Sequence, residues 1–397
     1  MGRIAPVFLF ALCMVTAGVG DAKTSASQPR AREASEPLLN KALDEIGKQR
    51  FDAALAHIDH LLRVQPNFRL AHMIRGDLLL AKVRTLTTLG NAPRGHEDRV
   101  EDLREEAIAR LRALRDRPRD DQIPRYLVQM PTDQKYAVVV DTGRSRLFVY
   151  RNEGKQPRLV NDYYISIGKR GAEKVREGDQ KTPIGIYHVT SSLPRKKLTD
   201  FYGSGAYPIN YPNEWDKRMG RNGHGIWLHG TPSDTFSRPP RASDGCVVLA
   251  NVDLDALGDQ LQIGKTQVVI SENVEWSTFD QLAGERKEFL EVPERWRADW
   301  ESRETNRYLE HYAKQFKSAD QNLAAWSAHK KQVNEGKDWI KLKLGNVGVL
   351  RNPGKEDLMV VSFDQDYKSN NLNNLMRKTQ YWIREGGRWR IVYEGAA

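Results

Sequence analysis

The spacing of apolar residues changes along this 397-residue chain, and the changes divide it into three parts. Leu39, Leu43 and Ile46 share one face of a helix, and helical spacing continues to about residue 114. From Tyr136 the alternation typical of strands takes over, first in KYAVVVD and then in RLFVYR. Helical spacing returns after residue 300 and gives way to strands again. The sequence therefore predicts a multidomain protein with an α-helical module (36–120), a mainly-β domain (135–272) and an α+β domain (300–397).

Within the helical part, the stretch RFDAALAHIDHLLRVQPNFRLAHMIRGDLLL resembles one degenerate tetratricopeptide unit. A single unit cannot bury its apolar faces alone. We therefore expect it to pack against a later helix, Leu103–Leu114, and to serve as a scaffold. Partner binding is the alternative.

Short strands are expected throughout the middle part. The runs before and after Thr142–Arg144 predict a hairpin, and four further strands are predicted at Tyr163–Ile167, Gly185–Val189, Gly225–His229 and Thr266–Ile270. In the last part, strands are predicted at Ile340–Leu344, Leu358–Phe363, Gln380–Arg384 and Trp389–Tyr393. Six of the 9 tryptophans follow residue 290, and we expect them to fill the core of this small domain.

The N-terminus has the features of an export signal. Arg3 precedes the apolar run 4–15, and small residues lead to a cleavage site after Ala22. Residues 1–22 are therefore predicted to be a signal peptide that sends the protein to the periplasm or outside the cell, with a retained membrane anchor as the alternative. Cleavage removes Cys13 and leaves Cys246 without a disulfide partner. Such a thiol is either buried and inert or kept for its reactivity.

The net charge of the chain indicates which kinds of binding partner to expect. The formal net charge is +10 and the pI about 9.4, which favours anionic neighbours such as wall polymers. Basic and acidic residues are interspersed, so the sequence gives no sign of nucleic-acid binding. His57 and His60 are three residues apart on one helix, but no third ligand accompanies them. Neither a metal nor a cofactor is expected.

The residues best suited to catalysis lie in the segment 224–257, HGIWLHGTPSDTFSRPPRASDGCVVLANVDLDAL. A thiol attacks as the thiolate, so Cys246 needs a nearby base or positive charge. His229 ends a predicted strand, and Gly230 follows it. Spacing alone allows a His/Cys dyad, although His and Cys often lie this close by chance.

These residues resemble the signature of the YkuD-type L,D-transpeptidases, in which HG is followed after a loop by S-x-G-C. His229–Gly230 and Ser243–Asp244–Gly245–Cys246 match it in order and spacing. An upstream block, EGDQKTPIGIYHV, also resembles the family through Gly178, Thr182, Pro183, Gly185 and Tyr187. The resemblance covers residues 135–272.

The resemblance implies a reaction. Cys246 would attack the carbonyl between the third, diamino residue of a peptidoglycan stem tetrapeptide and its terminal D-Ala, with His229 as base and the Gly230 carbonyl orienting the imidazole. Backbone N–H groups near Gly245 and Cys246 would hold the oxyanion, with Ser243 and Asp244 in the same turn. An amine would resolve the thioester to a 3–3 cross-link or a protein attachment, whereas water would leave a tripeptide.

The chain departs from the family at two positions. Asp244 and Val248 stand where many members have His and an Arg or Asn. Arg238 or Arg241 in the preceding loop is a candidate substitute for the missing basic residue, with a solvated loop arginine as the alternative. Two further residues, Tyr207 and His224, are candidates for substrate binding.

The tail from Arg307 to Glu394 resembles the nuclear transport factor 2-like (NTF2-like, SnoaL-like) fold. A YkuD domain followed by such a tail is similar to the cell-shape L,D-carboxypeptidase branch. The resemblances imply an L,D-transpeptidase, with an L,D-carboxypeptidase and a non-catalytic wall-binding adaptor as alternatives. The implied partners are peptidoglycan and wall-associated proteins that bind the terminal domains.

Overall fold

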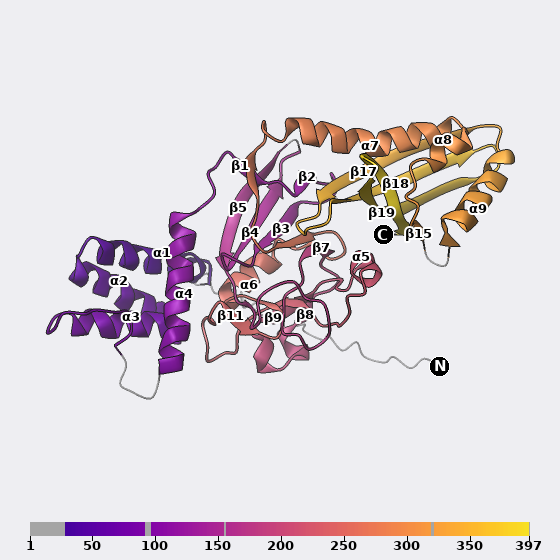
Figure 1. Ribbon diagram of the computed structural model, residues 1–397. Coiled ribbons are helices and arrows are strands. Elements are labelled where there is room, and N and C mark those ends of the chain that lie inside the picture. Colours follow the sequence, from indigo (N-terminus) through magenta and orange to yellow (C-terminus); the bar gives the residue numbers. More distant parts are fainter. Residues whose placement is uncertain (1–27, 92–96, 155, 319–320, 397) are drawn as a thin grey trace, which may run out of the picture.

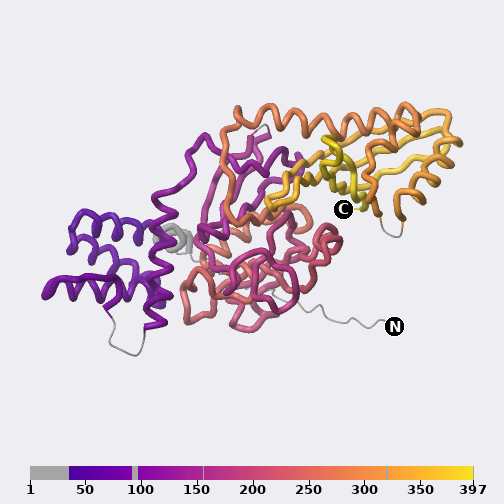
Figure 2. Tube along the Cα trace, viewed as in Figure 1, coloured from indigo at the N-terminus to yellow at the C-terminus, as the bar shows by residue number. Residues whose placement is uncertain are grey.

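The computed structural model describes residues 28–91, 97–154, 156–318 and 321–396. The predicted signal peptide lies outside these residues. The three parts follow one another in space as in sequence, with the helical module at one end, the mainly-β domain in the middle and the α+β domain at the other end (Figures 1 and 2). Within the described ranges, no helix combines the length and apolarity needed to cross a membrane.

Within the described residues the helical module contains four helices, and both the first and the last of them contact the central domain (Figure 1). Ile58, Leu70 and Ile74 are buried between the helices, as their spacing predicts. Ala107 of the last helix joins the same core, which confirms the expected packing on that helix. The helices are α1 (Gln28–Gly47), α2 (Phe51–Val64), α3 (Arg69–Leu80) and α4 (Glu97–Arg115).

The central domain is built on a five-stranded sheet of order β5-β4-β3-β13-β7. The predicted hairpin is present: Tyr136 pairs with Arg151 and Asp141 with Arg146. The strands are β3 (Tyr136–Asp141), β4 (Arg146–Asn152), β5 (Pro157–Tyr164), β7 (Gly185–His188) and β13 (Gln267–Ser271).

A smaller sheet of order β12-β10-β9-β8 covers one face of this sheet. Val138 and Leu147 of the larger sheet share a buried core with Leu228 and Val247 of the smaller one. The strands are β8 (Leu193–Pro194), β9 (Gly205–Pro208), β10 (Trp227–His229) and β12 (Val247–Val248), and a separate pair joins β6 (Ile167–Gly168) to β11 (Arg241–Ser243). Short helices connect them: η1 (Arg195–Lys197), η2 (Asp200–Tyr202), α5 (Glu214–Arg218) and α6 (Asn251–Gly258).

The C-terminal domain packs helices on a five-stranded antiparallel sheet of order β2-β17-β18-β19-β20, as predicted for an α+β domain. Trp296 and Trp382 are fully buried, which confirms their role in the core, whereas Trp339 is exposed. The elements are α7 (Ala283–Glu301), α8 (Thr305–Leu309), β15 (Lys317–Ser318), β16 (Gln321–Asn322), α9 (Leu323–Glu335), β17 (Ile340–Arg351), β18 (Leu358–Ser369), β19 (Asn373–Glu385) and β20 (Arg388–Ala396).

Two short strands from the segment before the central domain join the parts. β1 (Gln122–Pro124) pairs with β14 (Trp276–Thr278), and β2 (Leu127–Gln129) extends the C-terminal sheet by pairing with β17. Phe148 on the far face of the central sheet shares a core with Val360 and Tyr381 of the C-terminal sheet. The central and C-terminal domains are therefore joined by strand pairing and by a shared hydrophobic core.

Candidate active site

Two neighbouring parallel strands bring Cys246 and His229 to the same side of the smaller sheet. Leu228 of β10 lies opposite Val247 of β12, so Cys246 is level with Trp227, and His229 is two residues further along β10. Leu228 and Val247 face the buried core. Since successive side chains of a strand point to opposite faces, His229 and Cys246 share the other face as diagonal neighbours.

His229 is held by its own backbone and by aromatic rings. Its Nδ1 donates to the Gly230 carbonyl at 2.7 Å. A carbonyl only accepts, so in the neutral ring Nε2 keeps its lone pair and is able to take a proton. The imidazole lies 5.9 Å from the ring of Phe201 and 5.1 Å from that of Tyr202, centroid to centroid.

The imidazole is neutral at ordinary pH. His229 is only 1% exposed. Burial lowers its pKa to about 4; the hydrogen bond to Gly230 acts in the opposite direction, and the charge of Arg238 adds to the lowering. The ring is therefore free to act as a base.

The Cys246 thiol is partly exposed, and its Sγ donates to the Gly225 carbonyl at 3.4 Å. Burial raises the pKa of the thiol to about 11, although a backbone hydrogen bond from Trp227 lowers it. The resting pair is thus a neutral thiol beside a neutral imidazole. The sulfur therefore keeps its proton in the resting state, and a neighbouring base is needed to form the thiolate.

The turn before Cys246 is fixed by its own hydrogen bonds. Ser243 Oγ donates to the Cys246 carbonyl at 2.6 Å and accepts from the Gly245 N–H at 3.1 Å. Thr182 Oγ1 donates to the Gly245 carbonyl at 3.0 Å. Gly245 has φ +129°, a backbone conformation suited to glycine. The Gly245 amide is therefore already engaged by Ser243 in the resting turn.

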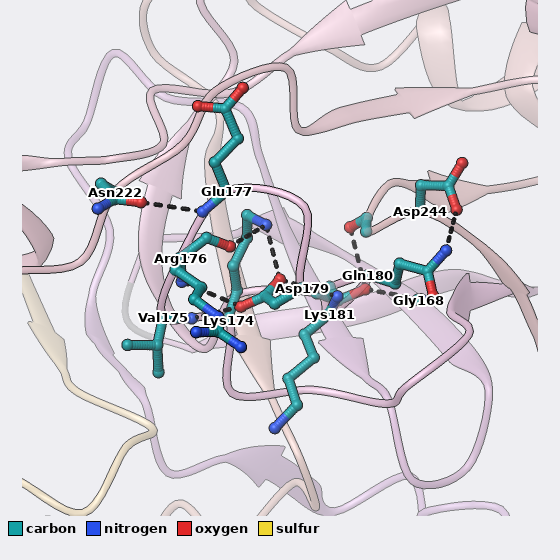
Figure 3. A network of polar contacts seen from close by, with 12 residues as sticks. Gly168, Lys174, Val175, Arg176, Glu177, Asp179, Gln180, Lys181, Asn222 and Asp244 are labelled. Carbon is teal, nitrogen blue, oxygen red and sulfur yellow. Dashed lines mark hydrogen bonds and ion pairs between the residues drawn. The ribbon is translucent and has the colours of Figure 1, made fainter.

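Asp244, one of the two departures from the family pattern, has local partners. Lys169 Nζ and Gln180 Nε2 each donate to its Oδ1 at 3.0 Å, the latter bond being visible in Figure 3. The exposed Asp244 carboxylate thus links the turn before Cys246 (the nucleophile turn, residues 243–246) to the loop that contains Gln180. The other departure, Val248, is buried and lies opposite His229.

That loop, residues 173–182, is organised around Asp179 (Figure 3). Its carboxylate accepts from Lys174 Nζ at 2.8 Å and from the backbone N–H groups of Val175, Arg176 and Lys181. Burial opposes ionisation, yet these hydrogen bonds lower the pKa of Asp179 to about 2. The buried Lys174 ammonium in turn lowers the pKa of the Cys246 thiol.

The other candidates from the sequence lie in different places. Tyr207 pairs with Leu228 across β9 and β10 and packs against the core, on the face opposite Cys246. Exposed His224 lies 3.5 Å from the Glu177 carboxylate at the edge of the Asp179 loop. Arg241 is exposed at the start of β11. The structure therefore does not bring Tyr207 to the dyad, and it leaves His224 and Arg241 on the surface.

Asn251 supports the site, although the sequence analysis did not identify it as a functional residue. Its Oδ1 accepts from the Ser204 N–H and its Nδ2 donates to the Thr231 carbonyl, both at 2.8 Å. A Cβ on Gly230 would lie 2.1 Å from Asn251 Oδ1, which explains the glycine after His229. No local sequence pattern predicts the role of this asparagine, because its hydrogen-bond partners are 20 and 47 residues away along the chain.

The residues that the structure describes contain no group of three or more His, Cys, Asp or Glu able to hold a metal ion. The arrangement offers a nucleophile, a neutral base and a hydrogen-bonded turn.

Comparisons with known proteins agree with this geometry. Residues 135–270 match the family model of the L,D-transpeptidase catalytic domain (YkuD), and residues 288–395 match that of the Cds6 C-terminal NTF2-like domain. A comparison with curated protein sequences gave no significant match.

Two solved structures are similar over most of their lengths. Bd1075 of Bdellovibrio bacteriovorus is 29% identical with a TM-score of 0.63, covering 70% of this chain and 98% of that one. The helical cell shape determining protein Pgp2 of Campylobacter jejuni is 27% identical with a TM-score of 0.57, covering 68% and 95%. The protein thus contains a catalytic domain of the YkuD L,D-transpeptidase family followed by an NTF2-like domain of the Cds6 C-terminal family.

Proposed function

We propose that this protein is a cysteine-dependent L,D-transpeptidase that acts on peptidoglycan stem tetrapeptides in the periplasm or outside the cell. The observation that carries the proposal is the pair of side chains on one face of β10 and β12. There the bond from Nδ1 to the Gly230 carbonyl leaves His229 Nε2 able to accept the proton of Cys246.

The reaction divides into two acyl transfers. As Sγ of Cys246 bonds to the carbonyl carbon between the third residue and the terminal D-Ala, its proton passes to Nε2 of His229. Collapse of the tetrahedral intermediate breaks the C–N bond, and the imidazolium returns the proton to the departing amine. The side-chain amine of a neighbouring stem then attacks the thioester, losing its proton to His229, and the thiol is restored.

Hydrolysis of the same thioester is the second candidate. It is favoured by the NTF2-like domain after the YkuD domain, an order similar to that of the cell-shape L,D-carboxypeptidase branch. The similarity to the helical cell shape determining protein Pgp2, of which 95% is covered, agrees with this. Water would then replace the acceptor amine and leave a trimmed tripeptide, so the protein would act as an L,D-carboxypeptidase.

The test is incubation of the full chain with purified muropeptides followed by mass spectrometry. Dimers linked between two diamino residues would support transpeptidation and exclude pure hydrolysis. Tripeptide with free D-Ala and no dimers would overturn transpeptidation in favour of hydrolysis. Cys246→Ala is the control and is expected to form neither product. If wild type is equally inactive yet still binds sacculi, the chain is a wall-binding adaptor.

Three further points stay predictions. The signal peptide would deliver the protein to its substrate, and its cleavage is checked by N-terminal sequencing of the exported protein. Wall-associated proteins are the expected partners of the terminal domains. The helical module, with its likeness to a single tetratricopeptide unit, is expected to be a scaffold, with partner binding as the alternative.

A further inference from the structure

Arg238 lies in the loop between β10 and β11 and reaches the His229 side of the candidate site through Phe201. Its guanidinium carbon is 4.6 Å from the centre of the Phe201 ring, and its Nη2 donates to the Phe201 carbonyl at 3.4 Å. Phe201 itself is in contact with His229. The arginine is partly buried, so it is not the solvated loop residue that the sequence offered as the alternative.

The charge of Arg238 acts on the site from this position. It lowers the pKa of the Cys246 thiol and that of His229. The geometry that accompanies these shifts is the contact with Phe201, whose ring centre lies 5.9 Å from that of His229. Burial lowers the pKa of Arg238, whereas Cys246 and Asp244 raise it. Within the described residues, no carboxylate oxygen lies within 4.0 Å of its guanidinium. A partly buried cation without an ion-pair partner is suited to receive an anion.

The helical module holds the loop that contains Arg238. The Phe236 ring packs on Phe68 of the module, with ring centres 4.3 Å apart. Asn67 Nδ2 donates to the Ser233 carbonyl at 3.2 Å, and the Phe236 N–H donates to the Asn67 carbonyl at 3.4 Å. Contacts from a separate domain therefore fix this loop two residues before the arginine.

A second set of contacts reaches the neighbouring residue and the arginine backbone. Ser237 Oγ donates to buried Glu106 of α4 at 2.7 Å, and Glu106 also accepts from Arg110 at 2.9 Å. The guanidinium of Arg110 covers the Tyr164 ring at 3.9 Å, and the Tyr164 hydroxyl donates to the Arg238 carbonyl at 2.9 Å. The backbone on both sides of the loop is thus anchored, which preorganises the Arg238 side chain.

The substrate of the proposed reaction carries an anion at the matching place. Its terminal residue has a free carboxylate two bonds beyond the scissile nitrogen. A cation packed on the ring that contacts His229 is a candidate partner for that carboxylate, since the planar guanidinium fork matches a carboxylate with two parallel hydrogen bonds. Val248, where many family members have an Arg or Asn, offers neither a charge nor a hydrogen bond on this face.

We propose that Arg238, held in place by the helical module, binds the terminal carboxylate of the stem peptide and so selects stems with an uncapped end. This inference rests on the proposed function. It makes Arg238 a specificity-determining residue of the YkuD domain and gives the N-terminal helices an indirect part in substrate recognition, since they position its loop.

The experiment compares two substrates that differ only at the end: a muropeptide tetrapeptide with a free terminal carboxylate and the same compound as the carboxamide. Wild type is expected to prefer the acid by about 100-fold in kcat/KM, the factor expected for a lost charge-assisted hydrogen bond. In Arg238→Gln, kcat/KM for the acid should fall by a similar factor, mainly through KM, and the preference should shrink to about 1. Arg158→Gln removes an exposed arginine of the same domain and should keep the full preference.

The outcomes separate this inference from the function on which it rests. Wild type that cleaves neither compound would overturn the proposed function. Wild type that cleaves both equally well, or an Arg238→Gln variant that keeps the preference, would overturn the role of Arg238 alone. Arg238→Lys, which keeps the charge but not the fork, should retain an intermediate preference. Circular dichroism of each variant checks that the fold is intact.

Discussion

Replacing Gly245 by alanine tests whether the nucleophile turn depends on a conformation that only glycine supplies. At φ +129° an alanine is strained by about 1–3 kcal/mol. Its Cβ would also lie 2.7 Å from the Lys181 carbonyl oxygen, a backbone atom that must move, and such overpacking costs about 1–3 kcal/mol more. We expect Gly245→Ala to lower the free energy of unfolding by about 4 kcal/mol.

Gly220→Ala is the matched control. Gly220 has φ +71° and is exposed, and a Cβ there meets nothing within 4 Å. Only the backbone strain remains, which is about 1 kcal/mol. Urea unfolding of both full-length variants is followed by circular dichroism. If the two variants have the same m-value, the difference between their midpoints measures the expected difference of about 3 kcal/mol in the free energy of unfolding.

Activity gives a second reading of the same pair. Displacing Cys246 by about 1 Å would cost about 100-fold in kcat/KM, so Gly245→Ala should lose activity while Gly220→Ala keeps it. If Gly245→Ala unfolds at the same urea concentration as Gly220→Ala and cleaves muropeptides at the wild-type rate, the turn does not need its glycine and the argument from backbone geometry is wrong.

Two further predictions concern buried charge. The lowered pKa of His229, about 4 against 6.5 when unfolded, gives stability that is complete above pH 6.5 and is lost as the pH falls through 4; between pH 7 and pH 5 the loss is about 2 kcal/mol. Urea unfolding at both pH values should show a smaller decrease for His229→Gln, whereas an unchanged decrease would refute the assignment. In the C-terminal domain, Glu394 is 2% exposed and pairs with Lys378, so Lys378→Met should destabilise by about 3–5 kcal/mol. Adding Glu394→Gln should restore part of this stability, and a double variant no more stable than Lys378→Met would contradict the pairing argument.

The local parts of this fold were predictable because short-range patterns determine them. The hairpin of β3 and β4 needs only two alternating runs and a turn between them. The buried helix faces of the module follow from apolar spacing. His229, Gly230 and Cys246 were selected because the proposed chemistry needs those residue types and the family pattern fixes their order, and their catalytic roles stay a prediction.

The arrangement of the site was not predictable, because it depends on pairing between distant residues. The parallel register of β10 and β12 puts Cys246 level with Trp227, and nothing local in the sequence specifies it. The same register places Tyr207 on the core side, since a shift of one residue exchanges the two faces of a strand. The role of Asn251 depends on a turn 20 residues away.

The link between the helical module and the active-site loop could not be foreseen for a related reason. Its centre is the buried pair of Glu106 and Arg110, two α4 residues whose spacing suggests an ordinary surface ion pair. Burial costs such a pair most of the energy that its attraction supplies, so it adds little net stability. The pair instead determines the orientation of α4, because Glu106 also accepts a hydrogen bond from Ser237 and the Arg110 guanidinium lies over the Tyr164 ring. These directional contacts fix the orientation of the module against the loop that contains Arg238, because each hydrogen bond requires one particular alignment of its two partners.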